Sequence, residues 1–222
     1  MDELKDIKAV FFDFDDTLAD REYYAYQCFK ELLSSKVDIQ DPIEFEAILQ
    51  DCMLWDEQGN VNKQHILNGL AEKYDIRIGI DEFNEYWAGN LWKYCVPFED
   101  AGKTLAYLSK HYHIGIITNG PSEGQRKKIM RSGLGKYFKP EDITVSGDYS
   151  FRKPDVRIFR IACDKAGVLP EEAVFVGDIF TNDVIGSYRA GMHPVWIWTH
   201  GRRCMDSNVT CIQKISDLMK IL

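Results

Sequence analysis

Apolar residues gather in short runs that end abruptly at polar residues. The first run covers residues 7–14, is partly β-branched, and is followed at once by carboxylates. A short apolar run bounded in this way predicts a buried strand that ends at a polar site. Similar predicted strands cover residues 113–118, 143–146, 173–176 and 194–198. The chain therefore offers five strands for one sheet.

Helical segments alternate with the later strands. The predicted helices cover residues 121–132, 155–166 and 182–190, and a glycine follows each of them. Pro121 suits the first position of a helix, and glycine suits the position just after its end. Alternating strands and helices predict an α/β fold, a Rossmann-like parallel sheet with helices on both faces and right-handed crossovers.

One long stretch breaks this alternation. Between the first two strands, residues 20–96 show helical patterns and no convincing strand. The predicted helices cover residues 23–35, 43–54, 63–74 and 82–93, with turn signals between them. We expect residues 1–19 and 97–222 to form the catalytic core and residues 20–96 to form an inserted helical domain.

Composition narrows the class of protein. The 222 residues are 45% hydrophobic and 28% charged, with a net charge of −8, so no broad basic surface is expected for nucleic acid or anionic lipid. No run approaches the length of a membrane-spanning helix. Six cysteines form no CxxC pair, which favours reduced thiols and a cytoplasmic protein. A monomer and a homodimer both remain open.

Acidic residues follow two of the predicted strands. Asp13 and Asp15 end the first strand, and Asp178 and Asp183 follow the strand over residues 173–176. Open parallel sheets bind ligands beyond the carboxyl ends of their strands, so these residues should converge on one crevice. Carboxylates at such a site are costly to desolvate without a cation. An oxygen-rich site of this kind suits Mg²⁺.

Groups that attract an anion follow other strands. Thr118 offers a hydroxyl, and the backbone amides of Asn119 and Gly120 are expected to be free at the start of the next helix. Lys153 supplies a positive charge. Taken singly, Thr118 also suits a helix cap and Lys153 a solvated surface position. Together with the carboxylates, in this order along the chain, they indicate a phosphoryl-transfer site.

These residues carry a family resemblance. The segment FDFDDTL at residues 12–18 resembles the DxDxT first motif of haloacid dehalogenase superfamily hydrolases. The other motifs follow in order, with IITNG at 116–120 similar to the second, KPD at 153–155 to the third, and VGD at 176–178 with Asp183 to the fourth. The resemblance covers residues 7–19 and 97–200 and points to the phosphatase branch.

The resemblance implies a role for each motif residue. Asp13 corresponds to the nucleophile that becomes aspartyl phosphate, and Asp15 to the acid that protonates the leaving oxygen and then activates water. Lys153 offsets charge on the transferring group. The implied metal site comprises Asp13, Asp15 through its backbone carbonyl, Asp178 and, beside them, Asp183. The implied substrate-binding residues are Thr17, Thr118, Asn119, Gly120 and Lys153.

Two features lie outside the motifs. Many family members have glycine where this chain has Asp16. The inserted helical region resembles a cap that closes over small substrates and helps to exclude water. Candidates for substrate specificity in or next to it are Asp20, Arg21, Tyr24, Trp55, Trp87 and Trp92, although aromatic residues at helical spacing more often belong to the core of the cap.

The resemblance implies a Mg²⁺-dependent phosphatase acting on a small phosphomonoester, with nucleoside monophosphates, phosphoglycolate and sugar phosphates as candidates. A phosphomutase is the main alternative, although no clear basic pattern for a second phosphate surrounds Lys63 and Lys73. A 2-haloacid dehalogenase fits less well, because halide leaves without a proton and the chain carries Asp15. A catalytically silent binding protein on the same fold is the remaining alternative.

Overall fold

The computed structural model describes residue 4, residues 6–198 and residues 208–222, and the chain divides into two compact units. The core unit comprises Met1–Asp20 and Pro97–Leu222. The helical unit comprises Arg21–Val96. Cys204, one of the expected reduced thiols, lies outside the described residues, and the other five cysteines form no disulfide among the described residues. No helix in the described ranges is long and apolar enough to cross a membrane.

A six-stranded parallel sheet forms the centre of the core unit. Its strands are β1 (Ala9–Phe12), β2 (His113–Thr118), β3 (Ile143–Val145), β4 (Ala173–Gly177), β5 (His193–Ile197) and β6 (Thr210–Ile212), in the order β3-β2-β1-β4-β5-β6. Every residue of β1 and β4 is buried, as expected for central strands covered on both faces. The predicted α/β fold class is therefore confirmed.

The predicted strands lie within one residue of the observed bounds except for β1, and one strand was not predicted. β1 ends at Phe12, two residues earlier than predicted, because the chain turns away from the sheet after Asp13. β6 was not predicted, since three residues at an edge carry too little pattern to be recognised. It pairs in parallel with β5.

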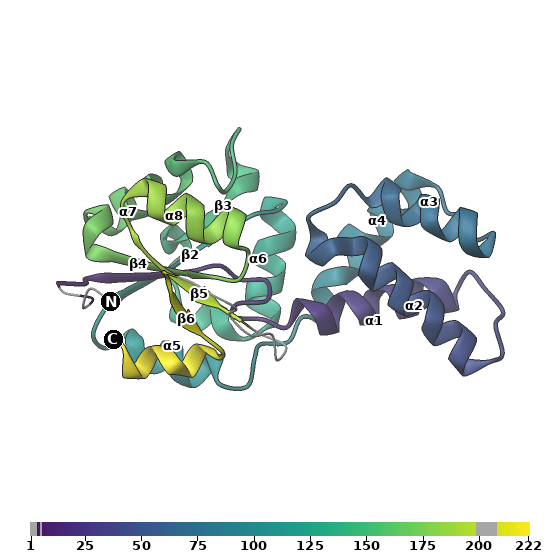
Figure 1. Cartoon of the computed structure of the whole chain (residues 1–222), viewed down its shortest axis with the longest axis horizontal. Helices are drawn as coiled ribbons and strands as arrows, with labels where there is room; N and C mark the ends of the chain where they lie inside the picture. The colour runs from purple at the N-terminus through teal and green to yellow at the C-terminus, as the bar shows by residue number, and fades with distance from the viewer. Residues whose placement is uncertain (1–3, 5, 199–207) are drawn as a thin grey trace. The chain divides into compact units, whose positions relative to one another are not determined.

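Helices cover both faces of the sheet (Figure 1). They are α5 (Ala101–Leu108), α6 (Ser122–Arg131), α7 (Val156–Ala166) and α8 (Ile185–Ala190). On one face, α7 and α8 pack together, and Phe159 of α7 meets Phe175 of β4 edge to face at 5.1 Å between ring centroids. On the other face, α5 packs with the 3₁₀ helix Ile215–Lys220. α5 was missed because it spans only two turns.

Local signals set the helix ends. Asp155 caps α7 by accepting a hydrogen bond from the Arg157 backbone N–H at 3.0 Å, and Gly167, with φ of +68°, ends it. The predicted helix over 182–190 is divided into a π-helical turn, Phe180–Val184, followed by α8. Single π turns often occur at functional sites, and this one carries Asp183.

The helical unit contains α1 (Arg21–Ser34), α2 (Pro42–Asp56), α3 (Lys63–Tyr74) and α4 (Ile80–Asn90), followed by a short 3₁₀ turn, Leu91–Tyr94. Its own hydrophobic core includes Phe29, Leu49, Leu67 and Phe83. Three of the specificity candidates belong to the packing of this unit. Tyr24 is fully buried, and Trp55 and Trp87 pack against the core.

Candidate functional site

The loop after β1 places the first carboxylates. The backbone N–H of Asp13 donates to Val176 O of β4 at 2.8 Å, so Asp13 lies against the middle of the sheet. The chain then turns sharply, and the N–H of Asp16 donates to Ala19 O at 2.8 Å. Asp16 has φ of +54°, in the left-handed region where glycine is favoured and aspartate is tolerated. The position at which many family members have glycine therefore has a left-handed backbone conformation in this loop, which explains the preference for glycine there.

Three carboxylates and one ammonium group meet at the ends of β1 and β4. Asp13, Asp178 and Asp183 each offer a carboxylate oxygen within 4.8 Å of the other two. The Lys153 Nζ lies 2.8 Å from Asp13 Oδ1 and 2.6 Å from Asp183 Oδ1, although its side chain is only 2% exposed. We call these four residues the acidic cluster. The motif residues from three separate segments are thus brought together.

Charge in the acidic cluster is incompletely balanced. Burial raises the pKa of Asp13 to about 7, with the neighbouring Asp183 and Asp15 adding to the effect and Lys153 opposing it. Burial and the charges of Asp183 and Asp13 raise the pKa of Asp178 well above its usual range. For Lys153, burial lowers the pKa, but Asp13 and Asp183 outweigh burial and raise it. The site favours an additional positive charge.

The carboxylates of the acidic cluster differ in their hydrogen bonds. Asp178 Oδ1 is buried and has no hydrogen-bond partner among the described residues. Asp183 is different, because its Oδ2 accepts from the Ile179 backbone N–H at 2.9 Å and its Oδ1 pairs with Lys153. A Cβ on Gly177 would lie 2.5 Å from the Asp183 side chain, so only glycine lets Asp183 approach β4 this closely. The chemistry of this set, buried carboxylate oxygens, fits Mg²⁺.

Asp15 and Thr118 meet at a second group of polar residues. Gln125 Nε2 lies 3.1 Å from Asp15 Oδ2 and 2.9 Å from Thr118 Oγ1. Lys128 Nζ lies 2.7 Å from Asp15 Oδ1 and 2.5 Å from Oδ2. Thr17 is fully buried nearby in sequence, and its Oγ1 has no hydrogen-bond partner among the described residues. We call Asp15, Thr118, Gln125 and Lys128 the α6 clamp.

The structure revises the expected state of the backbone amides after β2. The Gly120 N–H, which we expected to be free for an anion, donates to Ser146 Oγ at 3.0 Å. α6 begins only at Ser122, so Gly120 precedes its first turn. The Asn119 carboxamide is engaged too, because it accepts from the Lys153 N–H at 2.9 Å and donates to Lys153 O at 3.1 Å. Asn119 therefore holds the Lys153 loop beside β2.

Gln125 and Lys128 were not among the predicted site residues. The signal that could have found them is their spacing, since residues three apart on the predicted helix over 121–132 lie on one face. That helix also begins directly after Gly120, close to the carboxyl end of β2. On a single sequence, however, a glutamine and a lysine on a helix more often face solvent. Only the packing of α6 shows them 2% and 7% exposed.

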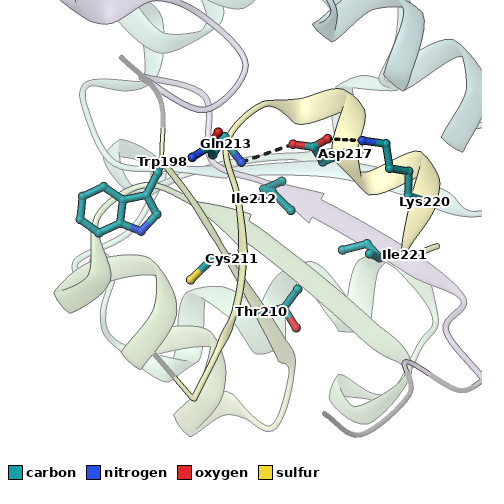
Figure 2. A pocket seen from close by; sticks show the side chains of 8 residues that line it. All are labelled: Trp198, Thr210, Cys211, Ile212, Gln213, Asp217, Lys220 and Ile221. Carbon is teal, nitrogen blue, oxygen red and sulfur yellow. Dashed lines mark hydrogen bonds and ion pairs between the residues drawn. The ribbon is translucent and has the colours of Figure 1, made fainter. Parts of the chain in front are cut away.

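A hollow lies at the β6 edge of the sheet (Figure 2). It is lined by Trp198, Thr210, Cys211, Ile212, Gln213, Asp217, Lys220 and Ile221. The Asp217 carboxylate pairs with Lys220 Nζ at 2.7 Å and accepts from the Gln213 backbone N–H at 3.4 Å. None of the predicted site residues lines this hollow.

The chain is similar to several known proteins. The family model of haloacid dehalogenase-like hydrolases matches residues 10–197. A glyceraldehyde 3-phosphate phosphatase of Methanothermobacter thermautotrophicus is 31% identical over 97% of this chain and 100% of the relative. A pyrimidine 5'-nucleotidase of Escherichia coli is 27% identical over 87% of each chain. The crystal structure of a phosphatase from Thermococcus onnurineus is 29% identical, with a TM-score of 0.66 over 97% of each chain.

The extent of these matches establishes the family. The family model spans most of the chain, and the relative from Methanothermobacter covers nearly all of it. The phosphatase names of the relatives also confirm the expected enzyme class, a phosphoric monoester hydrolase. The chain belongs to the haloacid dehalogenase-like hydrolase family.

Proposed function

We propose that this protein is a Mg²⁺-dependent phosphatase that hydrolyses a small phosphomonoester through an aspartyl-phosphate intermediate on Asp13. One observation carries the proposal. Asp13 lies in a buried cluster with Asp178 and Asp183, and Lys153 Nζ is 2.8 Å from its carboxylate. A nucleophilic carboxylate, a cation site and a fixed ammonium group at one point are what phosphoryl transfer requires.

In the first step, an Asp13 carboxylate oxygen forms a bond to phosphorus while the bond from phosphorus to the ester oxygen breaks. Asp15 enters this step protonated and gives its proton to that leaving oxygen, so the product departs as an alcohol and Asp15 is left as a carboxylate. Lys153 and the Thr118 hydroxyl bind the transferring phosphoryl oxygens, where negative charge is concentrated. Thr17, with its buried and unpartnered hydroxyl, is proposed as a further contact for substrate.

In the second step, Asp15 takes a proton from water, and the water oxygen attacks phosphorus. The bond between phosphorus and Asp13 breaks, which releases inorganic phosphate and restores both carboxyl groups. Asp13, Asp178 and the backbone carbonyl of Asp15 are proposed to hold Mg²⁺, with Asp183 fixing Lys153 beside them. Bound Mg²⁺ would supply positive charge that offsets the charge of the phosphoryl group and of the buried carboxylates.

The names of the relatives support a small substrate. They include a phosphatase for a triose phosphate and one for pyrimidine nucleotides. We propose an alkyl phosphomonoester of this size, and the helical unit is proposed to act as the cap domain that selects it. A cytoplasmic location stays a prediction, which fractionation of cells would test.

No observation favours the phosphomutase alternative. In the helical unit, Lys63 pairs with Asp56, and Lys73 pairs with Asp51 at 2.5 Å. Both lysines therefore already carry a carboxylate partner and are poorly placed to serve as a second phosphate site.

Release of inorganic phosphate from a panel of phosphomonoesters tests the proposed function. The panel should contain triose phosphates, nucleoside monophosphates, phosphoglycolate and sugar phosphates, each with and without Mg²⁺. We expect phosphate release that requires Mg²⁺, and no halide release from 2-haloacids. Isomerised sugar phosphate without free phosphate would favour a mutase, whereas full activity in excess chelator would contradict the role of Mg²⁺.

A further inference from the structure

Two side chains of α6 converge on one carboxylate. Gln125 and Lys128 lie about one helical turn apart and share a face of α6. Gln125 is 2% exposed and Lys128 7% exposed. Lys128 Nζ contacts both carboxylate oxygens of Asp15, at 2.7 and 2.5 Å, and Gln125 Nε2 contacts one of them at 3.1 Å. The Asp15 carboxylate is therefore held from two points of a single rigid helix.

The orientation of the Gln125 carboxamide follows from its neighbours. Its nitrogen lies 2.6 Å from Asn119 O and 3.1 Å from the Asp15 carboxylate, which both act as acceptors here. The group facing them must be the NH₂ end, and the same nitrogen is 2.9 Å from Thr118 Oγ1. The NH₂ group has two hydrogens, and Asn119 O and the Asp15 carboxylate take both of them as acceptors.

We propose that Gln125 and Lys128 are positioning residues for proton transfer by Asp15. They hold the Asp15 side chain in the orientation from which it reaches the leaving oxygen and then the attacking water. The inference rests on the proposed phosphatase function. In that function Asp15 acts twice at nearly the same place, once on the leaving oxygen and once on water.

Geometry explains why such a clamp would matter. A general acid must lie within hydrogen-bond distance of the atom that it protonates, and misplacement by about 1 Å is costly. An aspartate side chain has two rotatable bonds, so an unclamped Asp15 would spend part of its time turned away. A bidentate ion pair with Lys128 and a hydrogen bond to Gln125 remove most of that freedom.

The leaving group distinguishes positioning from a purely structural role. An alkoxide leaving group needs the proton, whereas a nitrophenolate scarcely needs it. Loss of Asp15 positioning should therefore slow alkyl phosphates much more than aryl phosphates. A general defect in folding or in magnesium binding should slow both alike.

The test compares two probes, p-nitrophenyl phosphate and the alkyl phosphomonoester that the wild-type enzyme hydrolyses fastest. For Lys128→Met we expect kcat/KM to fall by roughly 100-fold on the alkyl probe and by no more than about fivefold on the aryl probe. Gln125→Leu should show the same selectivity with a smaller loss, and Lys128→Arg should recover part of the alkyl activity. The loss should appear mainly in kcat.

Lys127→Met is the matched control. Lys127 is on the same helix, is 44% exposed, and pairs with Glu123 at 2.6 Å on the surface. This variant should retain wild-type activity on both probes. Equal losses on alkyl and aryl probes in Lys128→Met, with normal folding, would overturn the inference while leaving the phosphatase function intact. Absence of phosphate release by the wild-type protein would overturn the proposed function and this inference together.

A folding measurement keeps the inference testable if Lys128→Met is poorly active for other reasons. Removing Lys128 takes away the ammonium group that pairs with the Asp15 carboxylate. The melting temperature of Lys128→Met should therefore fall in the wild-type background. The fall should be smaller in an Asp15→Asn background, because no charge is then stranded. Equal falls in both backgrounds would show that Lys128 does not act on Asp15 and would overturn the proposal.

Discussion

Two buried ionic clusters, one in each unit of the molecule, are built in opposite ways. The acidic cluster of the core unit contains three carboxylates and one ammonium group, and Lys153 contacts two of the carboxylates, Asp13 and Asp183. In the helical unit, the single carboxylate of Asp56 lies between Arg21 and Lys63, and we call these three residues the basic cluster. Asp56 is fully buried, with the Arg21 guanidinium 2.6 Å from its Oδ2.

The pKa shifts of the buried carboxylates reflect this difference between the two clusters. Burial alone would raise the pKa of Asp56, but the charges of Arg21 and Lys63 outweigh it and hold the pKa below its usual range. In the acidic cluster, burial raises the pKa of Asp178, and the neighbouring carboxylates raise it further. The helical unit thus compensates its buried carboxylate with its own side chains, whereas the core leaves negative charge uncompensated.

This contrast separates a structural cluster from a functional one. A buried charge with partners in the chain supports the fold, and removing it strands those partners. A buried excess of one sign is unfavourable to the fold by itself and is relieved only by something that binds. Asp-to-Asn substitutions, which remove a charge and keep the size of the side chain, test this contrast.

The largest effect is expected for Asp13→Asn. A neutral amide is a poor nucleophile and a poor ligand for Mg²⁺, so kcat should fall by roughly 10⁴-fold or more. Initial rates of phosphate release measure this effect. Circular dichroism should show a normally folded protein, because the change removes a buried charge from an acidic cluster. Turnover above about one per cent of wild type would falsify the nucleophile assignment.

The next effect is on folding rather than catalysis. Asp56→Asn leaves Arg21 and Lys63 without their carboxylate, and breaking a buried ion pair in this way costs about 3–5 kcal/mol. Urea denaturation would measure the loss in the free energy of unfolding. Asp75→Asn is a suitable control, since Asp75 pairs with Arg77 at the surface, with both side chains about four-fifths exposed. A loss of stability no larger than that of the control would contradict the structural role of the basic cluster.

Asp178→Asn should stabilise the metal-free protein, whereas Asp56→Asn should destabilise it. Its carboxylate is destabilised in the folded state, so removing the charge should raise the melting temperature measured in chelator. Mg²⁺ should stabilise the wild-type protein, by about 2.7 kcal/mol at one hundred times its dissociation constant.

The increase in stability on adding Mg²⁺ should be much smaller in Asp178→Asn than in wild type. Ca²⁺, which prefers more ligands and looser coordination, serves as the comparison ion. Scanning calorimetry with and without each ion measures the melting temperatures of wild type and variant. Equal stabilisation of wild type and variant by Mg²⁺ would place the ion elsewhere.

A further effect is the pH dependence of metal-free stability. The folded pKa of Asp13 is raised to about 7, above its unfolded value near 4. Its contribution is therefore fully present below pH 4 and is lost as the pH rises toward 7, at no more than about 1.4 kcal/mol per pH unit. Denaturation curves between pH 5 and 7 in chelator should show this fall.

Asp13→Asn should have a flatter pH profile over the same range. Asp56 has a lowered pKa, so its contribution is present above pH 4 and disappears only at more acidic pH. Asp56→Asn should therefore keep the wild-type slope between pH 5 and 7. A wild-type profile that rises with pH over this range would contradict the burial of Asp13 in an acidic cluster.

Much of the fold could be predicted because its signals are local. Central parallel strands are continuous apolar runs, and β2 was predicted with its observed bounds, His113–Thr118. Helix ends were predicted where caps are local, as at Gly167 after α7. The short α5 and the edge strand β6 were missed because their pattern is too brief, and the π turn at Asp183 leaves no signature in a periodic pattern.

The sequence by itself determined the α/β order of elements, the helical insertion, and the positions of the polar residues that follow the strands, because each depends on neighbours along the chain. Only the tertiary structure decided how these residues act on one another. It joined Asp13 and Asp183 through Lys153, engaged the Gly120 amide with Ser146, and turned Gln125 and Lys128 inward onto Asp15. Burial and distance set these effects, and both arise from segments far apart in the chain.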